Sequence, residues 1–273
     1  MNHESDPEAQ LVEAVFDALD HGDPETALRL IHDGISGGDE EDPVLHFLAG
    51  LAMLELDRPA DAVTRLRRAA ELDPDDGEFR ATLADALFRA CRFDEAETES
   101  RAALGCDETL ALAHHVLGLV HEQADRLDDA DRELTRATEL EPDTFPQPFR
   151  QTRQRFESHL REAIEGLPTP FRDATREVEV SVTGVPAAEI LFEESPPLDP
   201  ELLGLFIGTP RSERTTFSAG GELPARIMLF QRNLERFAES PEDLVEQIGV
   251  TLRHELGHYL GLDEDEIGRA GHA

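Results

Sequence analysis

Lysine is absent from the 273-residue sequence, so its 25 cationic side chains are all arginine. This composition fits both a high-GC coding bias and adaptation to high salt. Long apolar runs are also missing, because none approaches the roughly 18 residues that a membrane-spanning helix needs. The first residues show neither the basic nor the apolar region of a signal peptide. From these absences we expect a cytoplasmic protein with no membrane partner.

Cysteine is nearly absent as well. Only Cys91 and Cys106 occur, which is too few for a disulfide framework or a cysteine-rich metal cluster. We therefore expect two reduced thiols with structural roles.

Acidic residues outnumber arginine by 60 to 25, which gives a formal net charge of -35 and a pI of about 4.5. A molecule of this charge repels nucleic acids and anionic membrane surfaces. We therefore expect no nucleic-acid partner, and we expect basic or neutral partners instead. Hydrophobic residues make up 39% of the sequence, which is enough for a packed core in one large domain or two smaller ones.

Small residues recur every 34 positions in the first half of the chain. One set stands at Ala62, Ala96 and Ala130, and a second at Gly50, Ala84 and Gly118. Apolar residues within each unit follow helical spacing, and turn signals divide each unit in two. We expect four units of two amphipathic helices, the first unit being the most degenerate. The second set of small residues is expected where the two helices of a unit cross closely.

Residues 70–74 read Ala-Glu-Leu-Asp-Pro and residues 138–142 read Thr-Glu-Leu-Glu-Pro. Together with the repeat length, these motifs resemble the tetratricopeptide family over about residues 8–144. The resemblance implies a right-handed helical solenoid whose concave face grips a peptide or a protein partner. A purely structural role as a spacer or dimerisation element stays open, and the sequence predicts no oligomeric state.

The repeats stop after Pro142, and residues 144–148 are the predicted junction between a domain at 1–144 and a domain at 145–273. A helix should follow, with one apolar face formed by Phe149, Phe156, Leu160, Ile164 and Leu167. Alternation at period two predicts a strand at 178–182. Further strands are expected at 202–208 and 225–230. The expected fold is therefore an all-helical solenoid followed by a small α/β domain with a short sheet.

A final helix has clear boundaries. Ser240 is a natural N-cap, Pro241 suits the first helical position, and Asp243 completes a capping box. Leucine and isoleucine then recur every four residues and predict a buried stripe, at Leu244, Ile248, Leu252, Leu256 and Leu260. His254 and His258 lie about 200° away from this stripe around the helix axis.

His254, Glu255 and His258 form a His-Glu-x-x-His pattern on this helix. Residues four apart lie on one helical face, so the two histidines can bind one Zn²⁺. Glu255 lies close to the ion without binding it, and can take a proton from a water that the metal acidifies. Gly261 ends the helix and turns the chain back, which suggests Glu264 as the third metal ligand.

Leu223–Phe230, followed by a helix and by the motif with Gly261-Leu262, resembles the bacterial zincin-like metallopeptidases called minimal zincins. Residues 202–208 are similar to that family's Leu-Gly-x-Tyr/Phe-x-Gly element, and the match spans about residues 150–268. The resemblance implies zinc on His254 and His258, with Glu255 as the general base. Where the family has aspartate three residues after the glycine, this chain has Glu264, and Asp265 or Asp263 could substitute.

The combined interpretation is a zinc-dependent metallopeptidase that hydrolyses peptide bonds. Its repeat region recruits a protein partner or a peptide or protein substrate. The alternative is a non-catalytic solenoid adaptor or scaffold, whose C-terminal zincin-like domain binds metal with little or no turnover.

Overall fold

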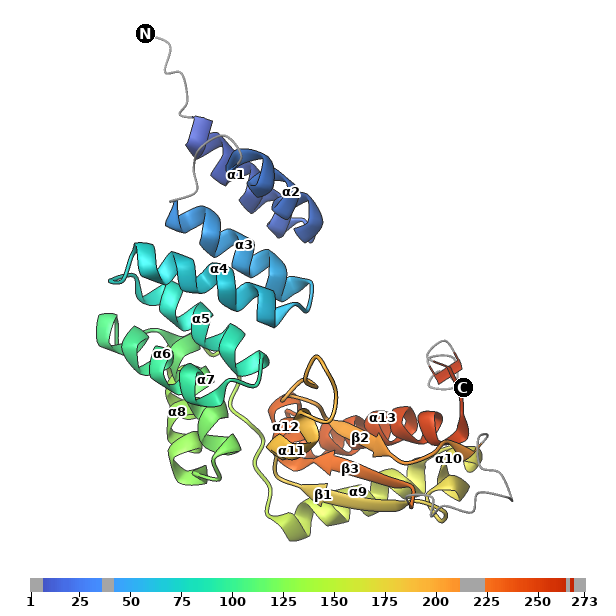
Figure 1. The fold of residues 1–273 in the computed structure, drawn as a ribbon. Helices are drawn as coiled ribbons and strands as arrows, with labels where there is room; N and C mark the ends of the chain where they lie inside the picture. Colours follow the sequence, from blue (N-terminus) through green and yellow to red (C-terminus); the bar gives the residue numbers. More distant parts are fainter. Residues whose placement is uncertain (1–6, 36–41, 212–223, 264–265, 268–273) are drawn as a thin grey trace. The chain divides into compact units, whose positions relative to one another are not determined.

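The computed structural model describes residues 7–35, 42–211, 224–263 and 266–267, and Figure 1 shows its fold. The chain divides into two units, Met1–Phe145 and Pro146–Ala273, and each is described separately. No helix within the described ranges is long and apolar enough to cross a membrane.

The described part of the first unit consists of helices that pack in chain order, each against the next (Figure 1). They confirm the predicted helical repeat array, in which every unit contributes two helices. Their bounds are α1 Pro7–Asp20, α2 Pro24–Ile35, α3 Pro43–Glu55, α4 Pro59–Leu72, α5 Gly77–Arg89, α6 Phe93–Cys106, α7 Ala111–Gln123 and α8 Leu127–Leu140.

The turn inside each repeat places one residue in the left-handed region, at Gly22, Asp57, Cys91 and Asp125 (φ 67, 52, 58 and 55). The N–H of the next residue then donates to a carbonyl five residues back, as from Arg58 to Met53 O at 2.9 Å. This is the Schellman arrangement that ends many helices. In three of the four turns, a residue other than glycine therefore takes a backbone conformation that favours glycine.

Close helix crossings explain the second set of small residues. A Cβ on Gly50 would lie 2.4 Å from Leu66 Cγ, and one on Gly118 would lie 2.7 Å from Leu134 Cγ. The predicted reason for these residues is thus confirmed. The third repeat solves the same crossing differently, because Ala84 stands at the glycine position and Ser100 at the leucine position, and both are fully buried.

The second unit contains a sheet with strand order β1-β3-β2, where β1 runs parallel and β2 antiparallel to β3. The strands are β1 Glu179–Thr183, β2 Gly204–Ile207 and β3 Arg226–Phe230, as predicted. The helices are α9 Arg153–Gly166, α10 Thr169–Ala174, α11 Ala188–Leu191, α12 Gln231–Phe237 and α13 Pro241–Leu260. The expected small mixed α/β domain is confirmed.

The core of the second unit joins α9, α13 and the sheet. Phe156, Ile227, Leu229 and Leu244 are fully buried within one cluster, and α9 and α13 lie along the sheet in Figure 1. This packing fixes α13, which carries the histidine motif, against β2 and β3.

The start of α9 differs from the prediction. Phe149 lies before the helix, because Thr152 is the N-cap and accepts a hydrogen bond from Arg155 N at 3.4 Å. The Phe149 N–H instead donates to Glu235 O of α12 at 2.8 Å. The short helices α10 and α11 were not predicted, since six and four residues are too few to show helical periodicity.

The segment before α9 also binds the Glu235 side chain, which is 1% exposed. The Glu235 carboxylate accepts hydrogen bonds from Gln151 N at 3.0 Å and from Gln231 Nε2 at 2.6 Å, and Arg150 Nη1 lies 3.4 Å away. Burial raises the pKa of Glu235 above its ordinary value, although these three partners act in the opposite direction.

Candidate metal site on helix α13

Capping fixes both ends of α13. Ser240 Oγ accepts a hydrogen bond from Asp243 N at 3.1 Å. The predicted capping box is shifted by one residue, because the Asp243 carboxylate accepts from Glu239 N at 2.9 Å rather than from Ser240 N. At the other end Gly261 takes φ 81, and Leu262 N donates to Gly257 O at 3.0 Å. Gly261 thus ends the helix as the sequence indicated.

The two histidines of α13 lie on the half-buried side of the helix. The predicted stripe is fully buried at Leu244, Ile248, Leu252 and Leu256, and half-buried at Leu260. The Nε2 atoms of His254 and His258 are 3.0 Å apart, with their ring planes at 85°. Two nitrogens bound to one tetrahedral Zn²⁺ lie about 3.3 Å apart. The observed convergence therefore fits two ligands of a single zinc ion.

Glu255 points to a neighbouring strand. Its side chain is 7% exposed, and its Oε2 accepts a hydrogen bond from the Phe206 N–H of β2 at 2.7 Å. Hydrogen bonds to an ionised carboxylate are among the stronger ones in proteins. Because β2 lies at an edge of the described sheet, its outward N–H groups need partners beyond the ladder, and Glu255 supplies one.

Gly204 makes this approach of β2 possible. A Cβ on Gly204 would lie 2.6 Å from Thr251 Cγ2 and 3.3 Å from Glu255 Cγ, so only glycine lets the strand lie this close to α13. Sequence reasoning did not assign Gly204 or the Phe206 main chain to the site. The glycine of the Leu-Gly-x-Phe element was the signal that could have found them.

Tyr259 ties α13 to the start of β1. It is fully buried, and its hydroxyl donates to Glu177 Oε2 at 2.8 Å. Its ring centroid lies 6.0 Å from that of Phe206. Tyr259 therefore connects the strand that binds Glu255 with the helix that carries both histidines.

The predicted third ligand, Glu264, and its substitute Asp265 lie outside the described residues. Asp263 is described and exposed; its Oδ1 accepts a hydrogen bond from Glu266 N at 2.8 Å. Among the described residues, no group of three His, Cys, Asp or Glu side chains is placed to hold a metal. A Cβ on Gly257 would lie 2.5 Å from Ile267 Cγ1, so Ile267 packs against α13 at Gly257.

Two protein families match parts of this chain. The zincin-like metallopeptidase family matches residues 175–272, which include all three described strands and α13. The tetratricopeptide repeat family matches residues 53–108, from the end of α3 to just beyond α6. No curated protein matches the sequence.

Solved structures resemble the chain over about half of its length. YrrB, described as a TPR protein with an unusual peptide-binding site, is 23% identical with a TM-score of 0.44, over 49% of this chain and 68% of YrrB. A double mutant of MamA RS-1 is 19% identical with a TM-score of 0.45, over 58% of this chain and 83% of MamA. Similarity of this size identifies neither a ligand nor a partner.

Proposed function

Since the chain carries a tetratricopeptide repeat region and a zincin-like metallopeptidase domain, we propose that it is a zinc-dependent peptidase. In this proposal the repeat region recruits a protein partner or the substrate. The observation that carries the proposal is the convergence of His254 Nε2 and His258 Nε2 to 3.0 Å, beside a Glu255 carboxylate held by β2.

The ligands in this proposal are His254, His258 and an acidic residue after Gly261, with Glu264 as first choice. Imidazole nitrogens and one carboxylate form a ligand set that Zn²⁺ accepts in catalytic sites. Bound there, Zn²⁺ would supply Lewis acidity for a peptide carbonyl and would lower the pKa of water.

Glu255 is the proposed general base. Its carboxylate takes the proton of the attacking water and delivers it to the leaving amine. The Phe206 N–H holds one oxygen of this carboxylate at 2.7 Å, so Glu255 keeps one orientation next to the histidines. A base with a fixed orientation needs little rearrangement during the reaction.

The test compares wild type with Glu255→Gln and His254→Ala. Zinc content is measured by elemental analysis, and cleavage is measured on a broad peptide library. We expect wild type to bind zinc and cleave, Glu255→Gln to bind zinc without cleaving, and His254→Ala to lose both. Wild type without zinc would refute the proposal. Zinc binding without any cleavage would instead support the non-catalytic scaffold.

A further inference from the structure

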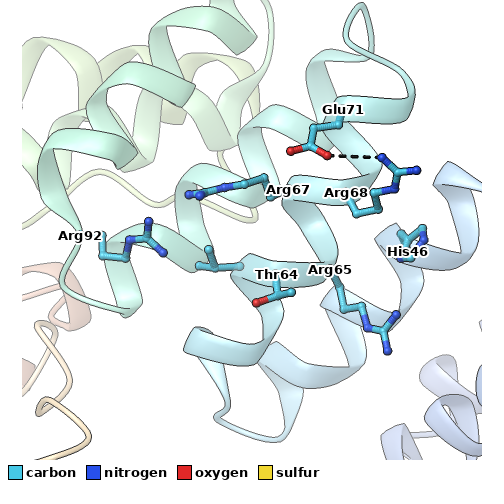
Figure 2. Close-up of a pocket in the computed structure, with 8 residues that line it drawn as sticks. His46, Thr64, Arg65, Arg67, Arg68, Glu71 and Arg92 are labelled. Atoms are coloured by element: carbon cyan, nitrogen blue, oxygen red, sulfur yellow. Dashed lines mark hydrogen bonds and ion pairs between the residues drawn. The ribbon is translucent and has the colours of Figure 1, made fainter.

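Arginines gather around a cavity of about 450 Å³ in the first unit (Figure 2). Arg65, Arg67 and Arg68 come from α4, and Arg92 precedes α6. In Figure 2, Arg67 and Arg92 lie on one side of the cavity, and Arg65 and Arg68 lie on the side of His46. We call this set the α4 arginine cluster.

Carboxylates offset only part of this positive charge. Glu95 binds both Arg67 and Arg92, at 2.9 and 2.6 Å, and Glu71 lies 3.4 Å from Arg68. Within the part of the chain that the structure describes, Arg65 forms no ion pair. Four guanidinium groups against two carboxylates leave a local charge of about +2, in a chain whose net charge is -35.

The last repeat provides an internal comparison. A cavity of about 510 Å³ on α8 lies at corresponding repeat positions, but it is lined by Asp128, Asp131 and Glu139 as well as two arginines. Arg132 pairs with Asp129 and Arg136 pairs with Glu139 on the same helix. The α8 cavity is therefore locally acidic, like the chain as a whole.

The difference between the two cavities arises at two repeat positions. Val63 and Arg65 of α4 correspond to Glu97 and Glu99 in the third repeat and to Asp131 and Glu133 in the fourth. Glu97 binds Arg126 at 2.6 Å, and Glu99 binds Arg80 at 2.9 Å. The second repeat thus lacks the acidic residues that occupy these two positions in the third and fourth repeats.

We propose that the α4 arginine cluster binds an acidic segment of a partner protein, through its aspartate or glutamate carboxylates. The guanidinium group presents paired donors that match a carboxylate. The four side chains are accessible to a ligand, with Arg67, Arg68 and Arg92 each about 40% exposed. The cavity volume lies within the range of about 300–1,000 Å³ that is usual for ligand pockets.

This inference extends the recruiting role proposed for the repeat region and does not depend on zinc binding. At physiological ionic strength the Debye length is about 8 Å. Distant carboxylates of the chain are then largely screened, whereas direct contacts between the arginines and a bound carboxylate are screened less. A local basic site can therefore select an acidic segment although the whole molecule is acidic.

The test uses the full chain with Glu255→Gln, so that a bound peptide is not cleaved. A fluorescein-labelled hexaglutamate peptide is titrated by fluorescence anisotropy, with hexaglutamine as the neutral control. We expect saturable binding of hexaglutamate and none of hexaglutamine. Adding Arg65→Gln and Arg68→Gln should weaken binding at least about tenfold, because each substitution removes a guanidinium group that can pair with a carboxylate of the peptide.

The matched control adds Arg132→Gln and Arg136→Gln at the α8 cavity, which should change the affinity less than about twofold. Circular dichroism checks that both double variants keep the helical content of the parent. The inference is wrong if hexaglutamate does not bind, if both double variants lose binding equally, or if only a phosphorylated peptide binds. A zinc-binding protein that cleaves nothing would leave it standing.

Discussion

The two units of the chain hold their elements together by contacts of different range. In the first unit, ion pairs between helices join residues about one repeat apart, such as Arg126 with Glu97, 29 positions away. In the second unit, the Phe206 N–H meets Glu255 from 49 positions away, and Tyr259 meets Glu177 from 82. A change in the first unit should therefore stay local, whereas a change in one strand of the second should reach the candidate metal site.

The largest effect is expected at Glu264, the proposed third zinc ligand of the second unit. Glu264→Ala should weaken zinc binding by about 100-fold or more, as loss of a directly bound ligand exceeds the usual effect of losing its supporting partners. Competition with a chromogenic chelator measures this.

Asp263→Asn is the matched control, because the Asp263 carboxylate already accepts a hydrogen bond from Glu266 N and asparagine can accept it too. Its zinc affinity should stay within about twofold of wild type. If Asp265→Ala lost much of its zinc affinity and Glu264→Ala lost none, Asp265 would be the third ligand instead of Glu264.

Gly204→Ala tests whether a strand change reaches the site. The added Cβ would lie 2.6 Å from Thr251 Cγ2, and such overpacking typically costs about 1–3 kcal/mol. The second unit should lose stability, and peptide cleavage should fall as β2 moves away from Glu255. Tyr259 is the only tyrosine and tryptophan is absent, so tyrosine fluorescence follows the unfolding of the second unit.

Two glycine variants complete this comparison. The Cβ that Gly249→Ala adds to α13 would have only Arg253 Nη1 near it, at 3.7 Å. This substitution should therefore stabilise the second unit by about 0.5–1 kcal/mol through helix propensity. Gly50→Ala, whose Cβ would lie 2.4 Å from Leu66 Cγ, should destabilise the first unit and leave the tyrosine transition unchanged. A shift of that transition by Gly50→Ala would contradict the expectation that a change in the first unit stays local.

Lowering the pH should change the stability contributed by two glutamates in opposite directions. Hydrogen bonds from Arg126 and Arg101 lower the pKa of Glu97 to about 2. Its stabilising effect is present above the ordinary value of 4.5 and is lost as the pH falls toward 2. Burial raises the pKa of Glu235, so the folded state favours its neutral form, and stability from this residue is lost as the pH rises above 4.5.

Glu97→Gln should therefore cost the first unit most at neutral pH, with a difference from wild type that shrinks in acid. Glu235→Gln should gain stability relative to wild type as the pH rises from 4 to 7, because the neutral amide has no carboxyl group to ionise in this buried place. Denaturant midpoints from helical circular dichroism and from tyrosine fluorescence, measured across this range, check both. Parallel pH profiles for wild type and either variant would contradict the assigned pKa direction.

The smallest effects are expected at the repeat turns. Asp125 is exposed and takes φ 55, so Asp125→Gly should stabilise the first unit by about 0.5–1 kcal/mol by removing strain. Gly22→Ala is the reverse change, since its Cβ would meet nothing within 4 Å at φ 67, and it should destabilise by a similar amount. Thermal unfolding followed by circular dichroism checks both. If the two variants changed stability in the same direction, the left-handed conformation would not be the source of strain.

The range of contacts also decides what the sequence could predict. The repeat helices and three strands follow from periodicity and turn residues, and both are confirmed, because these signals arise between near neighbours. The partner of Glu255 lies 49 residues away, and no spacing rule connects a carboxylate with a distant main-chain N–H. Cys91 at a left-handed turn position was likewise hidden, since cysteine is not a residue that marks such turns.

The roles of His254, Glu255, His258 and Glu264 stay predictions. The first three follow from helical spacing, and the structure places two of their nitrogens 3.0 Å apart. The third ligand depends on how the chain runs after Gly261, which helical periodicity does not determine.

The hydrogen bond between Glu255 and β2 has a consequence for self-association. An edge strand with unsatisfied N–H groups is a template for pairing with a second chain, and Glu255 occupies the outward N–H of Phe206. The residue proposed as the base thus also removes one main-chain donor that could pair with a second chain. Glu255→Gln retains an oxygen that can accept this hydrogen bond. Glu255→Ala removes both the proposed base and the acceptor of the Phe206 N–H.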